Sequence, residues 1–358
     1  MGINSVSIWR NRFCGDFMDK QKEMDQLRNL FNAKGFLIDP LLKDVVERYP
    51  FRISTHVEEM LLKSDSSLWR QIIPSLEEIK QTNFKEDPFD EKYQSPVPNL
   101  IHRYPDRVLL LTTDECAMYC RFCFRKRRAG KNRPALMTAF DEILKYIQKH
   151  SEIEEVILSG GDPLTLSDVH LDEMLREINK VSHVEIIRIH TRMLTANPNR
   201  ITTGFVQRLK KYKPLYIITH FNAVDEITSK TIEAANQLIE AGIVLGNQSV
   251  LLKGVNDSSQ ALSNLWRKLV KIRIRPYYLH HPDPVAGTSH FRVSIPKGLK
   301  IYNEVRSMSG LCVPRYVVDL PGATGKRVLS SACSYLEKDI ILSFQNSNEK
   351  EIEHPDAE

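Results

Sequence analysis

The chain has 358 residues, of which 42% are hydrophobic, and this is enough for one large core with a smaller additional unit. Its 50 basic and 45 acidic residues leave a formal net charge of +5, which is too small to indicate a dedicated nucleic-acid-binding protein. No stretch approaches about 18 continuous apolar residues and the first residues lack a signal-peptide pattern, so we expect neither a membrane-spanning helix nor export.

Cysteine usage bears on the compartment and on the chemistry. Three of the six cysteines lie within eight positions, and Cys14, Cys312 and Cys333 are scattered. This distribution is unlike a disulfide framework. We therefore expect a cytoplasmic protein whose clustered thiols serve metal or redox chemistry.

The two ends of the chain differ from its middle. Residues 1–99 are charged and helix-like, with helices expected over 18–34 and 74–81, a turn-rich connector over 86–100, and few residues of the kinds that carry chemistry. Residues 336–358 are acidic and are expected to be disordered. Residues 100–335 are left as the main folded domain.

Short β-branched runs alternate with amphipathic stretches in this domain. The runs cover residues 107–113, 155–160, 185–191, 215–221, 244–252, 275–280 and 316–321. A helix with one buried face is indicated by the spacing of Leu171, Met174, Leu175 and Ile178. Two later helices are expected to end at Gly242 and Gly310. The alternation predicts right-handed βαβ units and a parallel sheet that is closed, or nearly closed, into a barrel.

Chemically capable side chains cluster where these predicted strands end. They are Cys116, Gly160, Gly161, Asp162, His190, Arg192, His220, Asn222, Asp283 and Asp319, with Gln248 inside the fifth run. Any one of them is explained equally well as an ordinary strand-end polar residue. Because parallel barrels build their active sites at this end, six strands that finish in this way together favour a site.

Cys116, Cys120 and Cys123 have the spacing CxxxCxxC. A structural zinc site needs four ligands, and a 4Fe-4S cluster normally takes one thiolate per iron, so three thiolates leave one iron with an open position. With Phe122 before the last cysteine, the motif resembles the signature of radical S-adenosylmethionine (SAM) enzymes. The resemblance implies that the cysteines bind three irons, that SAM chelates the fourth, and that SAM is cleaved to a 5'-deoxyadenosyl radical.

The stretch SGGDP follows the second predicted strand. By itself it is more typical of a tight turn than of a binding site. After the cysteine motif it resembles the glycine-rich SAM-binding element of the same enzymes. The resemblance implies contacts with SAM from Ser159, Gly160, Gly161 and Asp162.

Lys326 follows the last predicted strand and a Pro-Gly-x-x-Gly turn. Most lysines are solvated surface residues, but such a turn can present an amine inward, where a dry pocket suits it to a Schiff base. The segment also loosely resembles a phosphate loop, although it lacks the G-x-x-x-x-G-K-[ST] spacing.

From residue 96 to residue 328 the chain is similar to the lysine 2,3-aminomutases, a radical SAM subgroup that uses pyridoxal phosphate (PLP). The similarity is carried in order by HRYPDRVLLL, CRFCFRKRRAG, SGGDPL, THFN, NQSVLLKGVND, RPYYLHHPD and VVDLPG. It implies an α/β fold, a partial TIM-type (β/α) barrel of the radical SAM kind with a helical N-terminal extension. It also implies that Lys326 forms the Schiff base with PLP, that Arg103 and Arg107 lie near its phosphate, and that Gln248 lines its pocket.

The same similarity implies substrate contacts. Arg125 would hold the substrate α-carboxylate, and Asp283 and Asp319 would hold its distal ammonium. Two aspartates favour lysine over glutamate. The other charges of the cysteine loop, Lys126, Arg127, Arg128 and Lys131, are expected to be solvated, and His280, His281 and His290 are expected to be hydrogen-bonded or exposed rather than metal ligands.

The expected activity is conversion of L-lysine to β-lysine by 2,3-amino migration, with flavodoxin or ferredoxin as electron donor. The chain resembles the shorter members that supply β-lysine for elongation factor P, and use of the product in osmolyte or antibiotic synthesis stays open. It lacks the extra C-terminal cysteines of longer members, so a homodimer is expected to form without intersubunit zinc. Three alternatives stay open: arginine or glutamate as substrate, a radical SAM enzyme without PLP, and a zinc-stabilised nucleic-acid-binding protein, which would explain CxxxCxxC followed by basic residues.

Overall fold

The computed structural model describes residues 20–63, 67–80, 83–131, 136–212, 214–320 and 325–329, with three further strands at 336–338, 341–345 and 351–355. Among these residues, no helix has the length and apolar character needed to cross a membrane.

A nine-stranded sheet in the order β1 to β9 forms the centre of the molecule. Seven consecutive strands pair in parallel, and they coincide with the seven predicted runs: β2 (Arg107–Thr113), β3 (Glu155–Gly160), β4 (Ile186–His190), β5 (Leu215–Thr219), β6 (Val244–Val250), β7 (Arg275–His280) and β8 (Arg315–Leu320). The prediction of a nearly closed parallel barrel is therefore confirmed.

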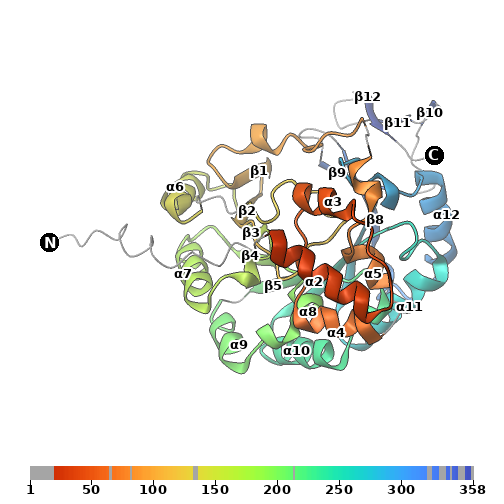
Figure 1. The fold of residues 1–358 in the computed structure, drawn as a ribbon. Helices are drawn as coiled ribbons and strands as arrows, with labels where there is room; N and C mark the ends of the chain where they lie inside the picture. Colours follow the sequence, from red (N-terminus) through yellow and green to blue (C-terminus); the bar gives the residue numbers. More distant parts are fainter. Residues whose placement is uncertain are drawn as a thin grey trace.

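Helices cover the outside of this barrel (Figure 1). They are α6 (Leu136–Lys149), α7 (Asp168–Asn179), α8 (Met193–Ala196), α9 (Thr203–Leu209), α10 (Ser229–Glu240), α11 (Ser259–Lys271) and α12 (Ile295–Val305). The four apolar residues predicted to share one face of α7 are all buried. Gly242 has φ +80°, as expected after α10, but α12 ends at Val305, and the prediction of a cap at Gly310 is wrong because Gly310 is not left-handed.

Two antiparallel strands at the sheet edges were not predicted. β1 (Leu100–Tyr104) pairs with β2, and β9 (Gly325–Val328) pairs with β8. Side chains of β1 reach across to the last strands: Arg103 Nη2 donates to the carbonyl oxygen of Leu320 at 2.6 Å, and the amide of Lys326 donates to the hydroxyl of Tyr104 at 3.0 Å. These hydrogen bonds connect the first strand of the sheet to its last two strands, and we call this junction of β1 with β8 and β9 the seam of the barrel.

The N-terminal region packs against one end of the barrel. Its helices are α2 (Lys20–Ala33), α3 (Leu42–Arg48), α4 (Thr55–Lys63) and α5 (Ser67–Ile72), and Figure 1 shows them lying across the barrel. The segment 74–81, predicted as a helix, has a short 3-10 helix, η1 (Leu76–Ile79), in its described part. The apolar core of this region includes Met118 from the cysteine loop and Ala196 from α8.

A buried acid, Glu78, ties the N-terminal region to the cysteine loop. It accepts hydrogen bonds from Arg121 Nε and Nη2 and from Lys126 Nζ, at 2.6 to 3.0 Å. Burial disfavours its charged form, but Arg121 and Lys126 outweigh burial and lower the pKa of Glu78. Since all three side chains are buried, each charge depends on the others.

The C-terminal segment differs from the expectation of disorder. Strands β10 (Leu336–Lys338), β11 (Ile341–Gln345) and β12 (Glu351–Pro355) form a separate antiparallel sheet. Acidic composition favoured disorder, but Ile341, Leu342 and Phe344 have high strand propensity, and the expectation is wrong for these three strands.

The SGGDP turn packs on the backbone of the cysteine loop. The amide of Asp162 donates to the carbonyl oxygen of Glu115 at 2.7 Å. Gly160 has φ +118°, and a Cβ atom on Gly161 would overlap the carbonyl group of Glu115. These glycines are therefore required for contact between two loops of the protein itself.

We expect Glu78→Gln to lower the free energy of unfolding by about 3–5 kcal/mol at neutral pH, because two buried cations lose their counter-charge. Urea unfolding measures this. The control is Glu77→Gln, which removes an exposed carboxylate paired with Lys80 and should cost less than about 1 kcal/mol. Because the pKa of Glu78 is lowered in the folded protein, its carboxylate stabilises the fold at pH values above the ordinary pKa of 4.5, and this contribution is lost as the pH falls. The difference in stability between wild type and Glu78→Gln should therefore shrink in acid. Equal losses in the two variants would contradict the role of Glu78 as the buried counter-charge of Arg121 and Lys126.

Gly161→Ala should lower stability by about 1–3 kcal/mol, because the overlap is with backbone that cannot move aside easily. The matched control is Gly204→Ala on α9, where a Cβ atom would meet nothing within 4 Å. Alanine is there expected to stabilise by about 0.5–1 kcal/mol, since it favours helix. Denaturant unfolding compares the two; a Gly161→Ala protein as stable as wild type would refute the packing role.

Candidate functional site

A cavity of about 530 Å³ lies inside the barrel and reaches the carboxyl ends of the parallel strands. All of the predicted site residues line it: Arg103, Arg107, Cys116, Cys120, Cys123, Arg125, Ser159, Gly160, Gly161, Asp162, Gln248, Asp283, Asp319 and Lys326. They come from segments spread over more than 200 positions of the chain. The fold therefore gathers the predicted residues in one place.

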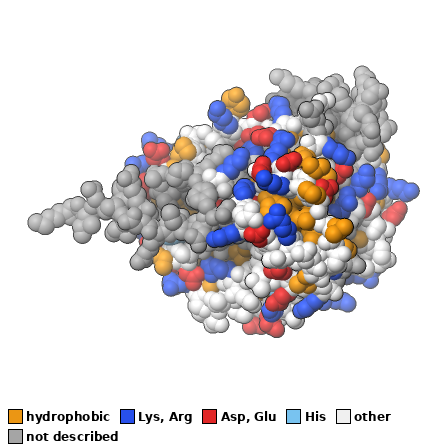
Figure 2. Space-filling view, viewed as in Figure 1, with side chains coloured by type: hydrophobic (Ala, Val, Ile, Leu, Met, Phe, Trp, Pro, Cys, Tyr) orange, Lys and Arg blue, Asp and Glu red, His pale blue; other side chains and the backbone are white. Residues whose placement is uncertain are grey.

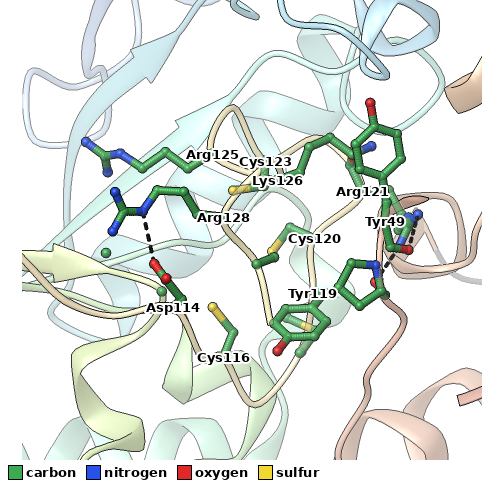
Figure 3. A pocket seen from close by; sticks show the side chains of 15 residues that line it. Tyr49, Asp114, Cys116, Tyr119, Cys120, Arg121, Cys123, Arg125, Lys126 and Arg128 are labelled. Carbon is green, nitrogen blue, oxygen red and sulfur yellow. Dashed lines mark hydrogen bonds and ion pairs between the residues drawn. The ribbon is translucent and has the colours of Figure 1, made fainter. Parts of the chain in front are cut away.

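The three loop cysteines are free thiols around a small adjoining cavity of about 50 Å³ (Figure 3). Over the described residues, no three His, Cys, Asp or Glu side chains converge closely enough for a single metal ion. In a 4Fe-4S cluster each thiolate binds a different iron, so three thiolates on one cavity are the number needed by a cluster that keeps one open iron position. Of the scattered cysteines, Cys312 is buried in the barrel core, and Cys14 and Cys333 lie outside the described residues.

The surroundings of Cys116 and Cys123 favour the neutral form of these two thiols. Burial, with a smaller effect from Asp162 and the other loop cysteines, raises the pKa of Cys116 well above its ordinary value, and burial raises the pKa of Cys123 to about 11. Metal ligation requires thiolates, so loading a cluster here would release protons.

Arg192, after β4, is a cation in contact with the cysteine loop. Its Nη1 donates to Cys120 Sγ at 2.8 Å, while Nη2 donates to Gln71 of α5 at 2.6 Å and to Glu226 at 2.9 Å. Its strand-end position was noted from the sequence, but its partners were not. The contact places positive charge beside a predicted cluster ligand.

The side chain of Asp162 is hydrogen-bonded to other residues of the protein. Its carboxylate accepts from Thr191 Oγ1 at 2.7 Å and from the amides of Leu164 and Arg192 at 3.0 and 2.8 Å. These bonds fix the SGGDP turn against β4. Ser159 and the two glycines line the cavity beside this carboxylate.

The basic run after Cys123 is not a solvated loop. Lys126 is only 4% exposed and pairs with Glu78. Arg127 pairs with Asp87 and Glu91, and Arg128 pairs with Asp114. The expectation of solvation is therefore wrong for these three cations, and it holds for exposed Lys131. Most of the acidic partners lie far away in the sequence, which is why the motif alone did not reveal them.

Arg125, expected to bind a substrate carboxylate, already contacts a carboxylate of the protein. Glu91 Oε1 lies 2.8 Å from its Nε and 2.7 Å from its Nη2. Glu91 belongs to the connector, which the sequence suggested was poor in chemistry. Both side chains are largely buried and line the cavity.

At the barrel seam, Lys326 lies on β9 and its Nζ is 2.9 Å from Asp319 Oδ2. Arg103 Nη1 lies 3.4 Å from Asp319 Oδ1, and His280 Nδ1 lies 3.8 Å from Oδ2. Lys326, His280 and Arg103 outweigh burial and lower the pKa of Asp319. The carboxylate is thus ionised and held by the predicted Schiff-base lysine.

Asp283 has the opposite electrostatic state. Burial, together with the negative charge of Asp319, raises its pKa to about 8. Burial and Lys326 lower the pKa of His280 to about 4, so the imidazole is neutral. The site thus holds one ionised and one protonated carboxyl, and the ionised carboxylate already faces two cations, the ammonium of Lys326 and the guanidinium of Arg103.

The remaining predicted residues lie in the same cavity with weaker constraints. Arg107 pairs with its neighbour Asp106 at 2.6 Å and its guanidinium stacks on Tyr104, while Gln248 lines the cavity from β6. His281, as expected, is hydrogen-bonded, with Nδ1 2.9 Å from the hydroxyl of Tyr316.

Comparison with known proteins agrees with this geometry. Residues 110–264 match the Radical SAM superfamily. The chain is 47% identical to L-lysine 2,3-aminomutase of Acetoanaerobium sticklandii, over 72% of this chain and 63% of that protein. It is 42% identical to L-lysine 2,3-aminomutase of Methanococcus maripaludis, over 90% and 76%. It is also 41% identical to glutamate 2,3-aminomutase of Clostridioides difficile, over 72% and 61%.

The chain thus spans less than two thirds of the length of some relatives and about three quarters of another. The extent of that second match, together with the gathered cysteines, glycine turn and lysine, identifies the chain as a member of the lysine 2,3-aminomutase family of radical SAM proteins.

Proposed function

We propose that this protein is an isomerase that converts L-lysine to β-lysine by moving the 2-amino group to C3. The observation that carries the proposal is the charge arrangement of one cavity. Arg125 lies beside the cysteine loop, and Asp283 and Asp319 lie at the seam. A substrate with a carboxylate and a distal ammonium is complementary to these groups, and lysine has both.

The residues present fit the three groups that the family uses. Cys116, Cys120 and Cys123 would hold the cluster, and Ser159 to Asp162 would lie against SAM. Lys326, Arg103, Arg107 and Gln248 would hold PLP. When bound, these groups supply a hydrogen-abstracting radical and delocalisation of an unpaired electron.

The protein's own residues bind and orient the substrate. Arg125 would hold the α-carboxylate through its free guanidinium edge, while Asp319 and Asp283 would hold the distal ammonium. Lys326 now occupies Asp319, and Asp283 carries a proton. If Lys326 held PLP, its amine would no longer neutralise Asp319 Oδ2, which could then accept the substrate ammonium while Arg103 stays on Oδ1. Loss of the Asp283 proton would complete the pair.

The same charges support lysine over the alternatives. The distal carboxylate of glutamate would face ionised Asp319, a like-charge contact in a buried site. The geometry excludes arginine less strongly, since a guanidinium also suits two carboxylates. On the face seen in Figure 2, basic and acidic side chains are interspersed, which gives no support to the alternative of a nucleic-acid surface.

We propose a cytoplasmic setting with a flavodoxin or ferredoxin as electron donor. The support is chemical: a cluster on Cys116, Cys120 and Cys123 would need thiolates and a one-electron reductant, and a reducing compartment supplies both.

Product analysis tests the activity. Anaerobically purified, reconstituted protein is incubated with a reductant, SAM, PLP and either lysine, arginine or glutamate. We expect iron, sulfide and a brown chromophore, with β-lysine as the product from lysine alone. Turnover of glutamate or arginine without turnover of lysine would overturn the substrate assignment, and stoichiometric zinc without sulfide would overturn the cluster.

Above pH 8, where Asp283 is ionised, Asp283→Asn should reduce kcat/KM for lysine by at least about 100-fold, because one partner of a buried ammonium is lost. Borohydride trapping of PLP on Lys326 should be unchanged. In wild type, kcat/KM should rise as the pH passes through about 8. Below that pH the raised pKa keeps Asp283 protonated, and a protonated carboxyl cannot pair with an ammonium. The variant should lack this rise.

The matched control for this variant is Asp257→Asn, which removes a partly exposed carboxylate paired with Lys297. It should leave kcat/KM and its pH profile unchanged. If Asp283→Asn abolished PLP trapping and lysine turnover to the same extent, Asp283 would have a structural role instead.

A further inference from the structure

Glu91 is a buried acid in a segment that the proposed mechanism does not use. It begins the short 3-10 helix η2 (Glu91–Gln94) of the connector, and its side chain is 10% exposed. One carboxylate oxygen, Oε1, binds Arg125, and the other, Oε2, lies 2.8 Å from Arg127 Nη2. Each oxygen of Glu91 therefore has a different arginine as its partner.

Arg127 anchors Glu91 independently of Arg125. Besides Glu91, it contacts Asp87 Oδ2 at 3.0 Å and donates to the carbonyl oxygen of Glu86 at 3.2 Å. The ring of Phe89 packs edge-on against Phe124, with centroids 5.7 Å apart. The connector is thus fixed to the cysteine loop on both sides of Arg125.

The charge on Glu91 is secured in the same way. Burial disfavours ionisation, but Arg125 and Arg127 outweigh it and lower the pKa of Glu91. Glu91 is therefore ionised and holds the guanidinium groups of Arg125 and Arg127 in place. If Arg125 left Glu91, its own buried guanidinium would lose its counter-charge.

The way in which Glu91 binds Arg125 leaves one edge of the guanidinium available. Glu91 takes the edge formed by Nε and Nη2. Arg125 Nη1 makes no hydrogen bond or ion pair with any residue that the structure describes, and Arg125 lines the main cavity. Figure 3 shows Arg125 and Arg121 extending to opposite sides of the cysteine loop. The end-on edge, Nη1 with Nη2, is therefore available to a ligand in the cavity.

We infer that Glu91 is a positioning residue that fixes Arg125 so that its end-on edge recognises a free carboxylate on the substrate. The inference rests on the proposed function, in which Arg125 contacts the α-carboxylate. Glu91 then sets a preference for amino acids with a free carboxylate over neutral amides or esters, because a planar guanidinium held in one orientation matches a carboxylate bidentately.

The test measures recognition of the carboxylate separately from recognition of the amines. Lysine and lysinamide share both amino groups, and only lysine has the carboxylate. Wild type and Glu91→Gln are compared by the KM and kcat for lysine and by the Ki of lysinamide as a competitive inhibitor. For Glu91→Gln we expect KM for lysine to rise about 10- to 100-fold, with the Ki of lysinamide within about 3-fold of wild type.

Asp87→Asn is the matched control, because Asp87 contacts Arg127 and not Arg125. It should leave KM for lysine within about 3-fold of wild type. Iron and sulfide content and borohydride-trapped PLP of Glu91→Gln are measured alongside, and values close to wild type show that the variant is folded and loaded. Its urea midpoint is expected to fall, because Arg125 and Arg127 lose a buried counter-charge.

Each other outcome overturns a stated part of the inference. Equal rises in KM for lysine and Ki for lysinamide would show a general structural role for Glu91. A lower KM for lysine would show that Glu91 competes with the substrate for Arg125. Wild type that does not turn over lysine would refute the proposed function itself, whereas active wild type with an unchanged KM in Glu91→Gln would refute only the role of Glu91.

Discussion

Buried positive charge in the cysteine loop is the constraint on which the rest of the structure depends. Arg121 and Lys126 lie within a few residues of the predicted cluster ligands, and neither is exposed to water. Buried cations are tolerated only with fixed counter-charges, and Glu78 supplies one for both. The N-terminal region that carries Glu78 is therefore part of the site, although its sequence appeared to be a peripheral extension.

The two ends of the cavity have complementary charges. Near the cysteine loop, Arg125 has one guanidinium edge held by Glu91 and another free. At the seam, Asp319 holds Lys326 and Asp283 stays protonated. Under the proposed function, release of Asp319 by Lys326 and loss of the Asp283 proton would place negative charge opposite the free edge of Arg125. A ligand with one negative and one positive end would then be favoured in one orientation.

The sequence predicted the features that depend on a local residue pattern, namely the parallel strands and the residues at their ends. The seven parallel strands are β-branched runs, and the order of a parallel barrel places Cys116, Asp162, Asp283 and Asp319 at one end. It did not predict the partners of buried charges, because Glu78 and Arg121 are 43 positions apart and nothing local marks either as paired. It also missed β1 and β9, short edge strands defined only by their pairing with β2 and β8.

The seam explains why the last strand matters as much as the first motif. β9 runs antiparallel to β8, so Lys326 lies opposite Asp319 in the ladder, and its amide reaches the hydroxyl of Tyr104 on β1. Arg103, the neighbour of Tyr104, contacts both Asp319 and the carbonyl oxygen of Leu320. The groups that close the barrel are thus the groups that line its charged end. A change in charge at Asp319 would act on the closure of the barrel as well as on the amine that it holds.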